Sequence, residues 1–442
     1  MVKTFAQVLE ARPVGRFQVA VVAVSFMVLV IDGIDIQLLS LVAPQIIDDW
    51  QITRTAFGPA LAAALTGMVI GSLVGGWLGD RFGRLLVLVG ATLLFGAATI
   101  LAATTGSPGE MALLRLVSGV GFGAAGPNAL ALASEWLPQR LRPRVATLLA
   151  IGTPTGGILG AWIVLLLLPD LGWRGVFVAC GLTTMALVLP MLAMREPPEN
   201  LQARGKGERA RANARWFGGA EVDLGSLAAG DRPETKSAAG NLFSRELLRL
   251  NLGAGLGFFF AAMVAYGMIA WTPVVFTSAG YSLDVGIRAL FVFNLASVIC
   301  SLLIGFVIER LGSRRVIMLG SAGMLASSLA LYWLMQAATA LAWLMQAVVA
   351  ANGATTGITI ATIYAMMIAG FPSSCRSAGL GYGLAAGRLG GVVLSLAGGV
   401  LLDAAGTATW PFFTVLAVAS VLAGLGAVIS DRHLVPQPKG AA

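Results

Sequence analysis

The chain has 442 residues, of which 57% are hydrophobic and only 11% are charged. A soluble globular domain carries about 25% charged residues, so this composition excludes an ordinary soluble protein and indicates a membrane protein. The formal net charge is +8, as in many nucleic-acid-binding proteins, but the positions of the basic residues, described below, argue against that function.

Long apolar runs alternate with short polar segments along the whole chain. The hydrocarbon core of a bilayer is about 30 Å thick, and a helix that crosses it needs about 20 apolar residues. Runs of this length predict an all-α membrane protein with twelve transmembrane helices in two six-helix halves. The predicted spans are 18–40, 55–78, 85–104, 111–135, 146–168 and 174–193, followed by 253–277, 285–308, 315–335, 341–369, 377–401 and 410–430.

The one long polar segment, residues 195–244, separates the two sets of spans. Its charged composition favours a partly disordered cytoplasmic linker that carries a short surface helix. We therefore expect a cytoplasmic N-terminal segment, a first helical bundle, this linker, a second bundle and a cytoplasmic tail. In that order, the parts cover residues 1–16, 17–194, 195–244, 245–430 and 431–442.

Lysine and arginine gather in alternate loops, and membrane proteins keep these residues on the cytoplasmic side. If the N-terminus is cytoplasmic, the opposite side receives only Arg54, Arg174 and Arg288. This asymmetry predicts that both termini are cytoplasmic. It also explains the net charge through topology rather than through nucleic-acid binding.

A nine-residue pattern occurs twice, between the second and third spans of each half. Residues 76–84 read GWLGDRFGR, and residues 305–313 read GFVIERLGS. Segments 138–157 and 372–391 share a second pattern at similar offsets. The chain is thus two related halves, and transporters built in this way bind their substrate near the bilayer midplane, between the halves.

The acidic-Arg-x-Gly turn in both copies resembles the signature loop of the major facilitator superfamily. In that family the loop latches the cytoplasmic side and gates access. Physically, Asp80 and Arg81 can pair across helix ends and Gly83 permits a tight turn, while the alternative is an ordinary positively charged turn. The gating residues predicted in the two copies are Asp80, Arg81, Gly83, Arg84, Glu309, Arg310 and Gly312.

Two carboxylates lie inside the first span, Asp32 and Asp35. A charge at the bilayer centre costs roughly 2.5–3.5 kcal/mol on insertion scales, and residues three apart share a helix face. Neighbouring carboxylates in an apolar setting favour the binding of a proton. The only histidine, His433, lies in the tail, so these two residues are the candidate proton-coupling site. The alternative is a structural salt bridge.

Arg388 lies twelve residues after Arg376, which begins its span at the cytoplasmic side. Twelve helical residues rise about 18 Å, which places Arg388 near the midplane. Its guanidinium cannot lose its charge, so it needs a fixed carboxylate or an anionic substrate. We predict that it binds the substrate anion, with a structural ion pair as the alternative.

Further residues are candidates for gating or for lining the substrate site. Arg115 lies at a depth similar to that of Asp35, so the two residues can pair as an outer gate or proton relay. Glu135 lies near Arg140 and Arg142, which favours an inner-side ion pair. The remaining gating candidates are Arg142 and Arg376, and the substrate-lining candidates besides Arg388 are Tyr266, Trp271, Tyr364, Tyr382 and Asn128, with Gln37, Asn294 and Asn352 of similar standing.

The sequence is similar to the aromatic acid–proton symporter branch of the superfamily, which imports benzoate, hydroxybenzoates and protocatechuate across bacterial inner membranes. The segments that carry the likeness run from Asp32 to Pro44, Arg115 to Glu135, Tyr266 to Pro273 and Arg376 to Gly390. The resemblance implies a proton-coupled importer of aromatic carboxylic acids in that membrane. It implies transport roles for Asp32, Asp35, Arg115, Glu135, Arg376 and Arg388. The chain departs from the branch at Ile34, where an aromatic residue is more usual, and in its longer linker.

Alternatives to this function stay open. One is an importer of another organic anion or a sugar. Another is a proton-coupled exporter, although residues 152–157 read GTPTGG and lack the Gly-Pro pair of such exporters. A membrane enzyme is disfavoured because HExxH, GxSxG and phosphate-loop motifs are absent from the sequence. We expect no enzyme activity, cofactor or metal, and a monomer whose partners are a small organic anion, protons and the bilayer.

Overall fold

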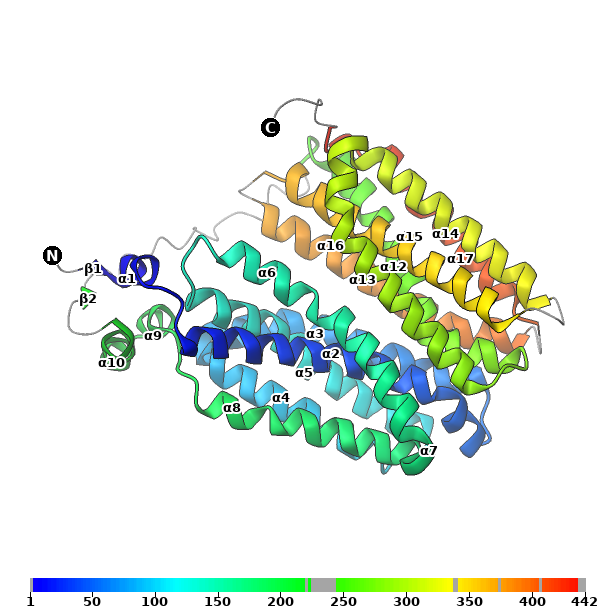
Figure 1. Ribbon diagram of the computed structural model, residues 1–442, viewed down its shortest axis with the longest axis horizontal. Helices are drawn as coiled ribbons and strands as arrows, with labels where there is room; N and C mark the ends of the chain where they lie inside the picture. The colour runs from blue at the N-terminus through cyan, green and yellow to red at the C-terminus, as the bar shows by residue number, and fades with distance from the viewer. Residues whose placement is uncertain are drawn as a thin grey trace.

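The computed structural model describes residues 3–218, 222–223, 244–336, 341–372, 375–404 and 408–435. Residues 219–221 and 224–243 of the predicted linker and residues 436–442 of the predicted tail lie outside these ranges. Within them the chain is almost entirely helical, and the helices form two bundles that lie side by side (Figure 1).

The first bundle is built from the helices that precede the linker. They are α2 (Arg16–Asp49), α3 (Arg54–Phe82), α4 (Arg84–Ala102), α5 (Pro108–Glu135), α6 (Arg142–Ala150), α7 (Gly152–Ala186) and α8 (Val188–Leu192). The second bundle follows the linker. Its helices are α12 (Leu248–Ser278), α13 (Leu283–Leu311), α14 (Ser313–Gln336), α15 (Ala342–Gly370), α16 (Arg376–Ala404) and α17 (Trp410–Ile429).

Eleven helical elements of the described chain are long and apolar enough to cross a membrane. One of them, Gly152–Leu192, has 41 residues. A straight helix of that length would measure about 60 Å, twice the hydrocarbon core. The backbone leaves the helical region at Gly172, with φ 62° and ψ 176°, and α7 folds back on itself there (Figure 1). The element therefore supplies two crossings, and the predicted fold with twelve membrane helices is confirmed.

Small residues let helices of the first bundle approach closely. A Cβ on Gly71 of α3 would overlap the backbone of Val120 on α5, and a Cβ on Gly123 would overlap that of Met68. Lipid tails are as apolar as leucine, so burial of apolar surface does not drive helices together in a bilayer. Close packing of small residues supplies that attraction instead. Large apolar side chains such as Leu73, Leu189 and Phe306 are exposed on the outside, where lipid would cover them.

The N-terminal segment and the start of the linker form a small unit beside the first bundle. It contains α1 (Phe5–Ala11), α9 (Pro198–Ala203) and α10 (Gly207–Gly218), the short helix expected in the linker. The two-residue strands β1 (Lys3–Thr4) and β2 (Val222–Asp223) pair in parallel. The Arg12 side chain also donates hydrogen bonds to the carbonyls of Phe217 and Gly218. We call this end of the helices the linker face and the opposite end the distal face.

The two bundles meet along four pairs of helices. α3 packs against α16, α7 against α13, and α2 against α12 and, at fewer positions, against α13. Hydrogen bonds join the halves at three places. At mid-depth, Arg388 of α16 bonds to α3. Further toward the distal face, Gln37 bonds to Asn294, and Arg54 bonds to the end of α16. The bundles are thus bonded together over the distal half of their interface.

Candidate functional site

Asp32 is a buried carboxylate near the middle of α2. Its Oδ2 accepts a hydrogen bond of 3.2 Å from the hydroxyl of Thr153 on α7. Its Oδ1 has no hydrogen-bond partner among the described residues. Arg388 of α16 and Tyr266 of α12 lie within electrostatic range of Asp32. The structure therefore brings together three of the predicted site residues, from both halves of the chain.

Arg388 reaches across the interface between the halves. Its Nη1 donates to the hydroxyl of Ser72 on α3 at 2.7 Å and lies 3.5 Å from the carbonyl oxygen of Met68. Within the described residues, no carboxylate forms an ion pair with this guanidinium. The alternative prediction of a structural ion pair is thus not what the structure contains. Ser72 and Thr153 were not among the sequence-based candidates, because hydroxyl groups are common in apolar helices and carry no pattern of their own.

Asp35 lies in a different environment from Asp32, although both are on α2. Arg115 of α5 donates to Asp35 Oδ2 at 2.5 Å, and the two side chains are only 1% and 2% exposed. Arg115 also donates to the Asp35 carbonyl, and Thr99 donates to Oδ1 at 3.0 Å. The pairing expected from their depth is present. Asp35 therefore has a counterion, whereas Asp32 has only a hydroxyl.

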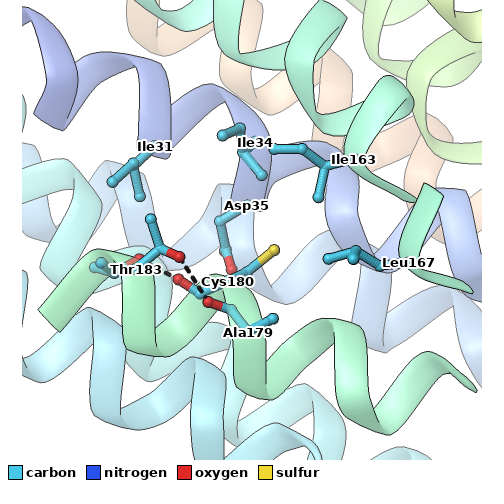
Figure 2. A pocket seen from close by; sticks show the side chains of 9 residues that line it. Ile31, Ile34, Asp35, Ile163, Leu167, Ala179, Cys180 and Thr183 are labelled. Carbon is cyan, nitrogen blue, oxygen red and sulfur yellow. Dashed lines mark hydrogen bonds between the residues drawn. The ribbon is translucent and has the colours of Figure 1, made fainter. Parts of the chain in front are cut away.

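A small cavity of about 70 Å³ adjoins Asp35 (Figure 2). It lies between α2 and the two arms of α7, and most of its walls are apolar. Its polar lining comes from Asp35, Cys180, Thr183 and Thr184, and both threonine hydroxyls donate to backbone carbonyls one turn earlier. The cavity is too small for an aromatic acid, so it is not the substrate site.

The first signature loop is held by Arg84 rather than by Arg81. Arg84 pairs with Asp80 at 2.5 Å and with Glu135 at 3.3 Å. The expected pairing of Asp80 with Arg81 is replaced because adjacent residues do not face each other on a helix. Arg81 instead lies over the Trp77 ring, 5.2 Å from its centroid.

Glu135 was expected near Arg140 and Arg142, and the structure places those residues elsewhere. Arg140 lies 3.8 Å from Glu10, and Arg142 donates to the carbonyl of Leu137. Arg376, at the corresponding place in the second half, donates in the same way to the carbonyl of Phe371. The two arginines thus cap equivalent turns, as the internal repeat implies.

Glu196 is a functional candidate that sequence reasoning missed. Its carboxylate accepts the backbone N–H groups of Arg84 and Leu85, at 2.5 and 3.0 Å, and so caps the N-terminus of α4. Burial raises the pKa of Glu196, and the hydrogen bonds from Leu85 and Arg84 oppose this rise. In the sequence, Glu196 is marked only as an acidic residue between the sixth predicted span and the pair Pro197-Pro198.

The second signature loop is covered by the equivalent segment of the second half. Gly312 adopts φ +78° at the turn, as Gly83 does with φ +118°. The N–H of Ser313 donates to the carbonyl of Leu434, and the N–H of Leu434 donates to the Ser313 hydroxyl. In each half, the chain that follows the sixth span therefore closes over the turn before the third.

Of the four remaining substrate-lining candidates, three contact another helix and one is exposed. Trp271 is fully buried and donates to the carbonyl of Ser395 at 3.3 Å. Asn128 uses its amide hydrogens on the carbonyls of Gly75 and Ala124. Tyr382 lies against Gly255, and Tyr364 is 37% exposed. Of the aromatic candidates, Tyr266 is the one that the structure places beside the charged cluster.

Two six-helix bundles with buried charges at mid-depth on their shared interface define a secondary transporter. The model of the Major Facilitator Superfamily matches residues 25–292 and 283–441. This chain belongs to that superfamily.

Curated relatives match the chain over nearly its whole length. The gallate transporter of Pseudomonas putida is 30% identical over 96% of this chain and 94% of its own. The 4-hydroxybenzoate transporter PcaK of Acinetobacter baylyi is 29% identical over 94% of this chain and 91% of its own. The 3-(3-hydroxy-phenyl)propionate transporter of Escherichia coli is 30% identical, over 92% and 93%. These relatives are transporters, which confirms the expectation that the chain is not an enzyme.

Solved structures support the same fold. A bacterial homologue of the lysosomal transporter Spinster, inward-facing and unoccupied, matches with a TM-score of 0.71 at 16% identity, over 94% of this chain and 97% of its own. The xylose transporter XylE of E. coli, in a partially occluded inward-open conformation, matches with a TM-score of 0.70 at 18% identity, over 93% and 97%.

Proposed function

We propose that this protein imports aromatic carboxylic acids of the benzoate and hydroxybenzoate class together with protons, by alternating access. It acts as a monomer in a bacterial inner membrane with both termini in the cytoplasm, as the placement of its basic residues favours. The relatives named for gallate, 4-hydroxybenzoate and 3-(3-hydroxy-phenyl)propionate support this substrate class. The observation that carries the proposal is the position of Arg388, a permanent cation without an ion-pair partner among the described residues.

Arg388 is the proposed binding group for the substrate carboxylate. Its current partners, the Ser72 hydroxyl and the Met68 carbonyl, are neutral and leave its charge uncompensated. A guanidinium offers donors in a planar fork that matches both oxygens of a carboxylate. Tyr266, packed against Gly391 one turn further along α16, supplies a flat ring beside that position. An aromatic acid has the two features that this arrangement accommodates.

Asp32 is the proposed proton-binding residue, and Asp35 is its structural neighbour. Asp35 already has Arg115 and Thr99 as partners, so a proton there would have to displace an ion pair. Asp32 accepts one hydrogen bond only and is buried near Arg388. Binding of an anion at Arg388 would remove the cation that favours the ionised form of Asp32. Substrate and proton would therefore bind together, and one proton per monoanion moves no net charge. Each further proton would add about 2.3 kcal/mol per 100 mV of membrane potential.

The conformational change follows from which contacts join the halves. Residues 17–194 and 245–430 are the proposed rigid bundles, and residues 195–244 are the cytoplasmic linker. The hydrogen bonds between the bundles lie at mid-depth and distally, and we therefore propose that the described conformation gives access from the linker face. The proposed cytoplasmic gate consists of the two signature loops. The first loop is held by Arg84, Glu135 and Glu196, and the second contains Glu309, Arg310 and Gly312. Arg142 and Arg376 are proposed to belong to the same gate.

Uptake of radiolabelled 4-hydroxybenzoate into proteoliposomes tests the proposal, with an inward proton gradient and unlabelled acids as competitors. We expect accumulation that a protonophore abolishes and that aromatic acids, but not glucose or aliphatic acids, inhibit. Arg388→Ala should raise the KM about 30-fold or more, because removing one partner of a buried charge pair costs about 2 kcal/mol or more. Arg288→Ala, which removes an exposed arginine paired with Asp284, is the matched control. Uptake that no aromatic acid inhibits would move the substrate to another class.

A further inference from the structure

The last turn of α16 and the first turn of α3 meet at the distal face, although they belong to different halves. The Thr55 N–H donates to Asp403 Oδ2 at 2.7 Å, and the Arg54 N–H lies 3.3 Å from Asp403 Oδ1. The Arg54 side chain donates back to the carbonyl of Leu402 at 3.2 Å. The first N–H groups of a helix have no acceptor within that helix. In α3, two of these N–H groups find their acceptor in Asp403, a carboxylate of the other half.

The backbones around this contact are too close for larger side chains. A Cβ on Gly399 would overlap the carbonyl of Arg54 and would lie 2.7 Å from its carbonyl carbon. One turn deeper, a Cβ on Gly58 would lie 3.1 Å from the carbonyl oxygen of Leu396. The absence of side chains at these two glycines therefore lets the Asp403 carboxylate reach the end of α3.

A second contact between the halves lies deeper along the same interface. Gln37 Nε2 donates to Asn294 Oδ1 at 3.0 Å, and Asn294 Nδ2 donates back to Gln37 Oε1 at 2.9 Å. Both amides are buried. This pair is neutral, so its partners can be exchanged for water at moderate cost. The Asp403 contact differs because it places an anion at the positive end of a helix.

We infer that Asp403 is the distal gating residue of the transport cycle. When the distal face opens, the ends of α3 and α16 must separate, and Asp403 loses the Arg54 and Thr55 amides. The cap therefore stabilises the conformation with access from the linker face relative to the conformation with distal access. The inference rests on the alternating access proposed above, but it does not depend on the substrate or on proton coupling.

The distance across the distal mouth tests this role without any substrate. A groove at the distal face is lined by residues of both halves, among them Gln45 and Leu283. Gln45 is exposed, and so is Ser282, which precedes Leu283. Because both side chains are exposed and Ser282 makes no side-chain cap for α13, each position can carry a spin label. The labels would be attached to cysteines at these positions after replacement of Cys180, Cys300 and Cys375, and the distances would be measured by pulsed electron resonance in nanodiscs.

Asp403→Asn should increase the population with a long label-to-label distance, in which the distal face is open, relative to the population with a short distance. We expect a change of about five- to tenfold, since the loss of a helix cap and of a charge at a helix end has an effect of this size. Asp403→Glu, which retains the carboxylate, should restore most of the short-distance population. Asp49→Asn is the matched control, because Asp49 is a distal carboxylate whose partners, Arg174 and Trp173, belong to its own half. An unchanged distribution for Asp403→Asn, or an equal change for Asp49→Asn, would overturn the inference. Uptake assays with the unlabelled protein separately decide the substrate.

Discussion

Asp35 and Arg115 form a buried ion pair of 2.5 Å, whereas Asp32, one turn earlier on the same helix, has no ion pair in the described structure. A buried pair is costly to break on one side, because the remaining charge is left without compensation. This difference between two nearby carboxylates is the reason why Asp32, rather than Asp35, is the proposed proton-binding residue.

Removing Arg115 alone should destabilise the protein strongly. We expect Arg115→Ala to lower the free energy of unfolding by about 3–5 kcal/mol, the usual cost of leaving a buried charge unpaired. Asp35→Asn combined with Arg115→Gln should recover much of this loss, since neither residue is then charged. Thermal unfolding in detergent measures both variants. If the double variant were no more stable than Arg115→Ala, compensation of charge would not be the role of the pair.

Asp32→Asn should separate transport from proton coupling. The amide keeps the size of the side chain and its acceptor for Thr153 but cannot exchange a proton. We expect loss of proton-driven accumulation, while exchange of external for internal substrate continues. Both rates can be measured in the same proteoliposomes, with Asp284→Asn as a control at an exposed carboxylate of the distal face. Normal accumulation by Asp32→Asn would exclude Asp32 as the coupling residue.

The close approach of α3 and α5 predicts a position-specific effect of adding one methyl group. Gly71→Ala should lower the free energy of unfolding by about 1–3 kcal/mol, because the new Cβ overlaps the Val120 backbone and the helices must separate. Gly76→Ala on the same helix should be neutral, since its Cβ would meet nothing within 4 Å. Similar thermal shifts in the two variants would show that helix propensity, rather than packing, controls the response.

Glu196 should make stability depend on pH in a defined direction. Burial raises its pKa in the folded state, so the folded protein holds this proton where the unfolded chain, with a pKa of about 4.3, has released it. The contribution to stability is therefore present at low pH and is lost as pH rises through the folded pKa. Glu196→Gln removes the titration. The melting temperature of this variant should therefore rise relative to that of the unmodified protein as pH increases from 4 to 8. Glu208→Gln, at an exposed position of α10, should not change the profile. A difference that does not vary with pH would contradict this account.

The sequence by itself determined the twelve spans, their grouping into halves and the presence of ionisable residues within them. Hydropathy is a local property, so a run such as 18–40 identifies a membrane helix whatever its neighbours are. The repeated turn at residues 76–84 and 305–313 likewise reads directly as two related halves. The depth of Arg388 followed from helical rise alone.

The tertiary structure decided the partners. Asp32 and Asp35 look alike in sequence, and only the packing of α2 against α5 and α7 gives Arg115 to one and Thr153 to the other. Asn128 and Trp271 were predicted to line a binding site, and only the structure shows that the Asn128 amide donates to the carbonyls of Gly75 and Ala124 and the Trp271 indole to that of Ser395. Glu196 and Asp403 lie far along the chain from the helix ends that they cap. A partner depends on which helices pack together and at what register, and no local pattern in a chain of apolar helices specifies that register.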